Sequence, residues 1–156
     1  MSGRVGPDDP RDGPRRPLDR LPTEQRPWVV LIVDDEPDML HALSDLVEGF
    51  LEHVVVLRAR SARQAVELLE RERVDLIVSD FKMPGMDGIE LLHMAKLGHP
   101  GVPRVMITAY DEQLVHDRAA AEAAVAAFVS KASDPHVFLQ RIVTLLQYNP
   151  AITPAP

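Results

Sequence analysis

The 156-residue sequence contains no cysteine, few aromatic residues and few basic residues. Without cysteine, the chain can form neither a disulfide framework nor a thiolate metal site. Aromatic residues make up 4% of the chain and apolar residues 46%, so a core must be mainly aliphatic. No apolar run approaches the roughly 18 residues of a membrane-spanning helix, and the N-terminus lacks the apolar segment of a secretory signal. These absences predict a soluble, cytoplasmic protein without a membrane partner.

Positive charge is in short supply, because 17 basic residues face 24 acidic ones and the net charge is −7. Domains that bind nucleic acids on their own usually present a basic face. The charge balance therefore argues against direct nucleic-acid binding. Six histidines show no metal-binding spacing, and we expect them on the surface.

Proline is concentrated outside the central segment of the chain. Residues 1–27 hold six prolines and six arginines, and residues 150–156 hold three more prolines. Large apolar residues are scarce in both segments, so neither can bury enough surface to offset the entropy lost on ordering. The sequence therefore predicts disordered tails over residues 1–27 and 149–156, with one folded domain over residues 28–148.

Within that domain, short apolar runs alternate with longer amphipathic segments. The runs are nearly all apolar, as is typical of strands covered on both faces, and they span residues 29–33, 54–57, 74–78, 104–108 and 125–129. Helical spacing or capping signals predict helices over residues 37–50, 61–71, 89–97 and 111–123, and from about residue 134. This alternation predicts an α/β fold of the flavodoxin-like (βα)5 type. It is a three-layer sandwich around a parallel five-stranded sheet of order 2-1-3-4-5.

Acidic side chains follow two strands that this order makes neighbours. Asp34 and Asp35 come after the first strand, and Asp80 ends the third. Ligands of open α/β sheets bind at the carboxyl ends of the strands, so these carboxylates should converge there. Close carboxylates repel one another, and Mg2+ with retained waters would compensate for the repulsion.

Two further polar residues are expected at the same edge of the sheet. Thr108 ends the fourth strand and offers a hydroxyl donor, and Lys131 follows the fifth strand as a point charge for a phosphoryl oxygen. Phosphoryl transfer to a carboxylate needs a nucleophile, a cation and donors for the oxygens. Each residue alone could be a helix cap or a surface residue, and the prediction depends on their joint placement.

Four motifs now resemble the receiver domain of two-component response regulators over about residues 28–148. They are Val33-Asp34-Asp35-Glu36-Pro37, Asp80-Phe-Lys-Met-Pro-Gly-Met-Asp-Gly88, Thr108-Ala109 and Phe128-Val-Ser-Lys131. The resemblance implies a phosphorelay signalling module that catalyses only its own phosphorylation and dephosphorylation. Its partners would be a sensor histidine kinase or histidine phosphotransfer protein, and a downstream protein or a missing output domain.

The resemblance also implies a role for each matching residue of the phosphorylation site. Asp80 would be the phosphoacceptor, and Thr108 and Lys131 would bind phosphoryl oxygens. Thr108 and Phe128 would form the switch that changes the surface made by the fourth helix, the fifth strand and the fifth helix. The metal ligands would be Asp34, Asp35, Asp80 and the backbone carbonyl of Lys82, with Mg2+ as the cofactor.

The chain departs from the family pattern in three places. Ala132 follows Lys131 where a cis-proline is usual, and a cis bond to another residue costs about 2.5–4 kcal/mol, so we expect a trans bond. Ala124-Val125 replaces the usual Gly-Ala, so the fourth helix lacks its glycine cap and is expected to run long or to be mobile. The bulky Lys82 and Tyr110 beside the site predict slow hydrolysis of the phosphorylated form.

Other functions fit less well. An aspartate-nucleophile phosphatase of the haloacid dehalogenase type needs Asp-x-Asp after the first strand, where this chain has Asp34-Asp35-Glu36. A flavodoxin-like FMN binder would need a phosphate loop rich in serine, threonine and glycine at that place. Two alternatives stay open: a receiver-like interaction module that works without phosphorylation, and the N-terminal fragment of a larger regulator.

Overall fold

The computed structural model describes residues 22–109 and 113–147 of the chain. Residues 1–21 and 148–156 lie outside the described residues, and they include most of the two predicted tails. The disorder of these tails therefore stays a prediction. Tyr110 and its predicted effect on hydrolysis also lie outside the described residues. The described chain begins with a turn, in which Thr23 and Arg26 exchange two backbone hydrogen bonds of 3.1 Å.

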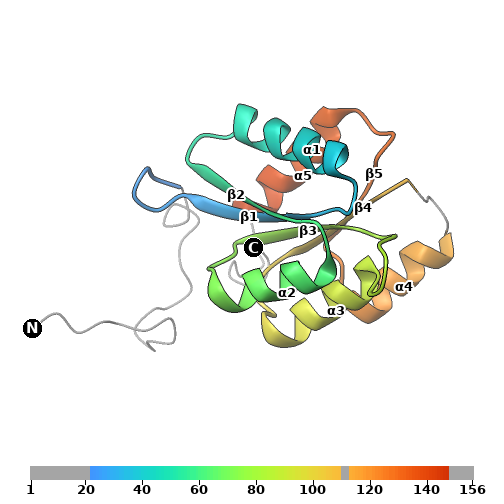
Figure 1. Ribbon diagram of the computed structural model, residues 1–156. Coiled ribbons are helices and arrows are strands. Elements are labelled where there is room, and N and C mark those ends of the chain that lie inside the picture. The colour runs from blue at the N-terminus through green and yellow to red at the C-terminus, as the bar shows by residue number, and fades with distance from the viewer. Residues whose placement is uncertain (1–21, 110–112, 148–156) are drawn as a thin grey trace, which may run out of the picture.

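Within the described residues, five parallel strands form one sheet in the order β2-β1-β3-β4-β5, which confirms the predicted topology (Figure 1). The strands are β1 (Trp28–Val33), β2 (Val54–Ala59), β3 (Leu76–Asp80), β4 (Arg104–Thr108) and β5 (Ala127–Ser130). At their carboxyl ends, Val33 pairs with Ser79, and Thr108 pairs with Ser130. This register brings the residues that follow β1, β3, β4 and β5 to one edge of the sheet.

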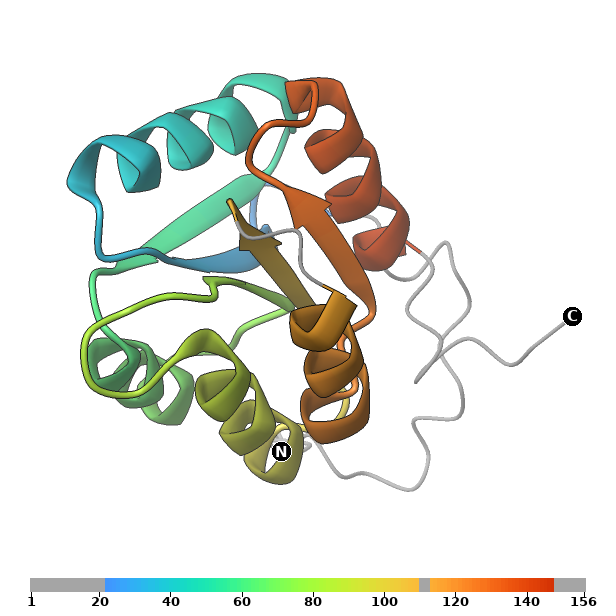
Figure 2. The same ribbon diagram turned by 90° about the vertical axis from the view of Figure 1, so that its right-hand side faces the viewer.

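Capping side chains mark the beginning of two of the helices in the described part. The helices are α1 (Pro37–Phe50), α2 (Ala62–Arg71), α3 (Gly88–Gly98), α4 (Gln113–Ala123) and α5 (Pro135–Gln147). Ser61 caps α2 by accepting a hydrogen bond from the Gln64 N–H, and Asp87 and Glu90 form a reciprocal capping box at α3. Figures 1 and 2 show α1 and α5 on one face of the sheet and α2, α3 and α4 on the other.

The core consists of one aliphatic cluster on each face of the sheet. Leu31 and Val33 of β1 point into the cluster under α2, α3 and α4, whereas Val30 and Ile32 point into the one under α1 and α5. All four side chains are fully buried, which explains why the strand reads as a continuous apolar run. Burial of each such side chain contributes about 1.5–3 kcal/mol, so the sheet is a rigid platform for its edge.

The expectation that helix α4 runs long was wrong, whereas its mobility stays a prediction. The helix ends at Ala123, and Ala124 follows it with a φ of 46°, in the left-handed region that glycine usually occupies.

In the part of the chain that the structure describes, no helix has both the length and the apolar character needed to cross a membrane.

Candidate functional site

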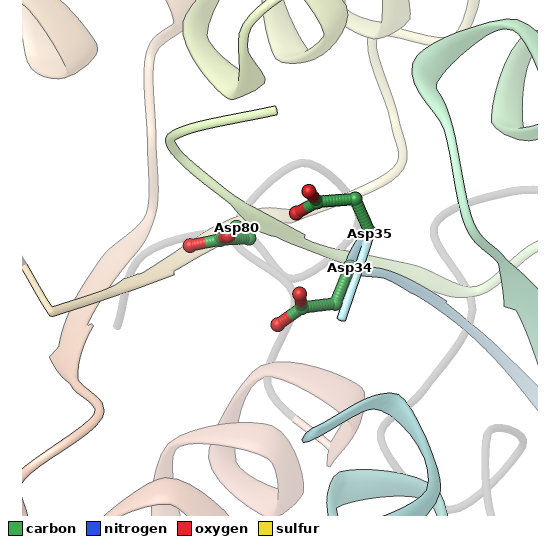
Figure 3. Close-up of side chains that lie close together, drawn as sticks. All are labelled: Asp34, Asp35 and Asp80. Carbon is green, nitrogen blue, oxygen red and sulfur yellow. The ribbon is translucent and has the colours of Figure 1, made fainter. Parts of the chain in front are cut away.

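Three carboxylates converge at the carboxyl edge of the sheet. Side-chain oxygens of Asp34, Asp35 and Asp80 lie within 4.8 Å of one another (Figure 3). Asp34 and Asp35 follow β1 and Asp80 ends the adjacent β3, so the strand order alone brings them together. Asp34 is fully buried, Asp80 is nearly so, and Asp35 is half-buried. In Figure 3 the three side chains project to the same side of the strand ends.

The chain fixes Asp34 and Asp80 locally before any ligand is considered. Asp34 Oδ1 accepts a hydrogen bond of 3.0 Å from the Glu36 N–H, just ahead of α1. Asp80 Oδ1 accepts one of 2.9 Å from the Phe81 N–H. A Cβ atom at Gly88 would clash with the backbone carbonyl oxygen of Asp80. The glycine therefore allows α3 to begin directly against the end of β3.

Lys131 connects these carboxylates across the sheet. Its Nζ donates to Asp34 Oδ2 at 2.9 Å and lies 3.3 Å from Asp80 Oδ1. Its backbone N–H donates to the Thr108 carbonyl at 2.9 Å, which also ties the end of β5 to the end of β4. Burial alone would lower the pKa of Lys131, but the hydrogen bond that it donates to Asp34 and the charges of both aspartates outweigh burial and raise this pKa.

The balance is different at Asp80. Burial raises the pKa of Asp80 from 3.8 to about 6, because desolvation and the charge of Asp34 outweigh the attraction of Lys131. One ammonium group is therefore too little positive charge for this cluster. A hard divalent cation with carboxylate ligands would supply the rest, and this donor set fits Mg2+.

A cavity of about 450 Å³ opens over the carboxylates. Acidic and basic side chains share its lining with apolar ones: Asp35, Glu36, Asp80, Lys82, Met83, Pro84, Ala109 and Lys131. Thr108 is fully buried at the end of β4, next to Ala109 in the chain. The cavity is large enough to hold a phosphoryl group next to Asp80.

The loop after Lys131 takes the expected course. The described residues contain no cis peptide bond, so Lys131 and Ala132 are joined in trans. A turn follows, in which the Ser133 N–H donates to the Ser130 carbonyl at 3.0 Å. The Ala132 N–H donates to Ser130 Oγ at 3.2 Å, a bond that proline at residue 132 could not make.

Phe128 has a partner that the sequence did not reveal. Its half-buried ring stacks on the ring of His116 in α4, with 3.6 Å between centroids and 23° between planes. Of the six histidines, four are exposed, as expected, whereas His99 and His116 are half-buried. The signal for the stacking was hidden because Phe128 and His116 are 12 positions apart on different elements.

The fold and this edge of the sheet match a known class of protein. A family model for the response regulator receiver domain matches residues 30–143. The chain therefore belongs to the response regulator receiver domain family, which confirms the resemblance in the sequence motifs.

Individual relatives agree with this assignment. Transcriptional regulatory protein GlrR of Escherichia coli (strain K12) is 31% identical over 128 residues, covering 82% of this chain and 28% of GlrR. An uncharacterised 14.6 kDa protein of Leptolyngbya boryana is 37% identical over 128 residues, covering 80% of this chain and 92% of that protein. The signal receiver domain of an HD domain-containing protein from Pseudomonas fluorescens Pf-5 has a TM-score of 0.75 and 28% identity, covering 80% of this chain and 99% of that one. The chain thus spans less than a third of the length of GlrR.

Proposed function

We propose that Asp80 is the phosphoacceptor of a two-component phosphorelay. The observation that carries this proposal is the position of its carboxylate, which ends β3 at the cavity, beside Asp34 and 3.3 Å from Lys131. Phe81 N–H and Lys131 Nζ both approach Oδ1, so we assign nucleophilic attack to Oδ2. A new bond forms between Oδ2 and phosphorus while the bond from phosphorus to the donor's histidine nitrogen breaks.

The proposed metal ligands are Asp34, Asp35, Asp80 and the backbone carbonyl of Lys82. When bound, Mg2+ neutralises the carboxylates and the phosphoryl oxygens that approach them. Lys131 would pair with one phosphoryl oxygen, and its partial burial strengthens that attraction. The Thr108 hydroxyl would hold another oxygen from the end of β4.

Phosphorylation would then act on the surface of α4, β5 and α5. Thr108 and Lys131 share a backbone hydrogen bond, and Phe128 lies three residues before Lys131 on β5. A movement of Thr108 toward the phosphoryl group would pull on β5 and release Phe128 from His116. The added charge is local, and the release of Phe128 would convert it into a change of the surface.

The biological setting that we propose follows the family. A sensor histidine kinase or a histidine phosphotransfer protein would donate the phosphoryl group in the cytoplasm, and the receiver would catalyse its own dephosphorylation. The receiver would span residues 28–148. It would act on a downstream protein or on an output domain joined to it. We propose that residues 1–27 and 149–156 are tails outside that receiver.

The test is phosphorylation by acetyl phosphate with Mg2+, followed by intact mass spectrometry. Wild type and Asp45→Asn, which changes an exposed aspartate of α1, should each gain one phosphoryl group. Asp80→Asn should gain none, and chelation of Mg2+ should abolish the gain in wild type. If Asp80→Asn reacted as fast as wild type, the assignment of Asp80 would be wrong. If none of the proteins reacted, the proposal would give way to the alternative of a receiver-like interaction module that works without phosphorylation.

A further inference from the structure

The C-terminal end of α4 lacks the residue that usually terminates such a helix. Ala124 takes the left-handed conformation, with φ at 46°, although its Cβ atom disfavours that region. The last carbonyl groups of a helix also have no partner within the helix. Groups outside α4 can supply hydrogen bonds to these carbonyls and hold the strained residue in place.

A buried arginine at the start of β4 supplies the partner. Arg104 is only 8% exposed, and its Nε donates to the Ala123 carbonyl at 2.8 Å. One terminal nitrogen donates to the Ala124 carbonyl at 3.3 Å, and the other donates to the Val102 carbonyl at 2.8 Å. The guanidinium group thus bridges the end of α4 and the loop before β4. Its positive charge lies at the negative end of the helix dipole, where it is favourable.

Two more hydrogen bonds hold the same end of the helix. His93 of α3 lies with Nδ1 2.6 Å from the Glu122 carbonyl, and because a carbonyl only accepts, Nδ1 carries the proton. The Ala126 N–H donates to the backbone carbonyl of Arg104 at 2.8 Å. The end of α4 is therefore fixed to α3, to β4 and to the loop before β4.

At the other end of α4, the described contacts are side-chain packing. Val115 is buried there, and the ring of His116 stacks on Phe128 of β5. Leu114 is 68% exposed. This end lies beside the carboxyl end of β4, where Thr108 is located, whereas Arg104 begins the same five-residue strand. One short strand thus joins the fixed end of α4 to the phosphorylation site.

We propose that Arg104 is a pivot about which α4 swings when Asp80 is phosphorylated. The proposal rests on the proposed function, since phosphorylation supplies the driving force. The N-terminal half of α4, with Leu114 and His116, moves relative to the sheet while Ala123 and Ala124 stay in place. The hydrogen bonds from Arg104 stabilise the end of α4, where a glycine would usually terminate the helix. Because this end is fixed, a shift at Thr108 becomes a rotation of the helix.

The chain has no cysteine, so pairs of spin labels can be attached to introduced cysteines without first removing a native one. One label goes on exposed Glu70 of α2 as a reference. The second goes on Leu114 in the first turn of α4 or on exposed Ala121 near its end. Distance distributions are recorded by pulsed electron spin resonance, with and without beryllofluoride and Mg2+ as a phosphoryl mimic. Bound fluoride is followed separately by fluorine NMR.

In the wild-type background, the mimic should shift the 70–114 distribution by more than its width and leave the 70–121 distribution unchanged. In Arg104→Met, the 70–121 distribution should shift as well, because the pivot is gone. Adding Ala124→Gly should restore the wild-type pattern in part, since glycine accepts the left-handed conformation. Arg118→Met, which changes an arginine of α4 that pairs with Glu122, is the matched control and should behave like wild type.

Equal shifts at both positions in wild type, or no shift at either, would overturn the pivot. An unchanged 70–121 distribution in Arg104→Met would overturn the role of Arg104. If that variant fails to fold, Arg104→Lys replaces it, because lysine keeps the charge but loses the fork of donors. Bound fluoride with the wrong movement refutes the pivot alone, whereas the absence of a bound-fluoride signal refutes the proposed function and the pivot together.

Discussion

Lys131 Nζ lies 2.9 Å from Asp34 Oδ2, although the two residues are 97 positions apart in the chain. Asp34 is fully buried and the Lys131 side chain is 11% exposed, so the pair is shielded from solvent. The same nitrogen lies 3.3 Å from Asp80 Oδ1. One side chain that follows β5 therefore offsets part of the negative charge that the ends of β1 and β3 contribute. Its removal should affect both stability and signalling.

Lys131→Met should stay folded but lose about 3 kcal/mol of unfolding free energy in metal-free buffer at pH 7. The loss arises because Asp34 and Asp80 keep a buried negative charge without their partner. Urea unfolding measures it, with Lys96→Met on α3 as the control for the change of residue type. A loss equal to that of the control would contradict the buried ion pair.

Asp80 should make the stability of the metal-free protein depend on pH. Its folded-state pKa of about 6 lies above the ordinary 3.8, so its contribution is fully present below pH 3.8 and is lost as pH rises through 6. The full shift corresponds to at most about 3 kcal/mol. Asp80→Asn should therefore be more stable than wild type at pH 7 in a chelating buffer, and this advantage should vanish near pH 4. Urea unfolding at both pH values measures the difference, and an advantage of equal size at both would contradict the raised pKa.

Magnesium should raise the thermal stability of the wild-type protein. A ligand that binds only the folded state at 100 times its dissociation constant contributes about 2.7 kcal/mol. Calorimetry with and without a chelator should show this gain in wild type and in Asp45→Asn, and a much smaller gain in Asp35→Asn. Equal gains in all three proteins would place the ion elsewhere.

Gly88→Ala should destabilise the protein by about 1–3 kcal/mol, since a Cβ atom at this position meets the Asp80 carbonyl. Gly49→Ala is the matched control, because no atom lies within 4 Å of the added methyl group. This change in α1 should instead stabilise the helix by up to about 1 kcal/mol. The two variants are compared by thermal unfolding, and similar shifts of Tm would contradict the close approach of α3 to β3.

The sequence predicted the positions of Asp34, Asp35, Asp80 and Lys131 because strand order decides which strand ends are neighbours. That inference needs only the apolar runs and the rule for parallel sheets. The third strand was predicted over residues 74–78, but it spans Leu76–Asp80. Ser79 and Asp80 are polar, but they still belong to the strand because their backbones pair with β4. A prediction from apolar side chains alone therefore ends the strand too early.

The support for α4 could not be predicted in the same way. Arg104 is the first residue of an apolar run, and nothing near it in the chain indicates that it contacts the end of a helix 19 positions later. Its partners are carbonyl oxygens, which every residue carries, so composition gives no signal. The buried arginine is instead explained by the carbonyl groups that it binds, two of which belong to the end of α4 and to the left-handed Ala124.

The most direct test of the account locates the phosphoryl group chemically. The wild-type protein is phosphorylated with acetyl phosphate and Mg2+, reduced with borohydride and digested, and the peptides are sequenced by mass spectrometry. Reduction converts an aspartyl phosphate to homoserine, and the account predicts homoserine at residue 80 alone. Homoserine at another aspartate, with residue 80 unmodified, would contradict it.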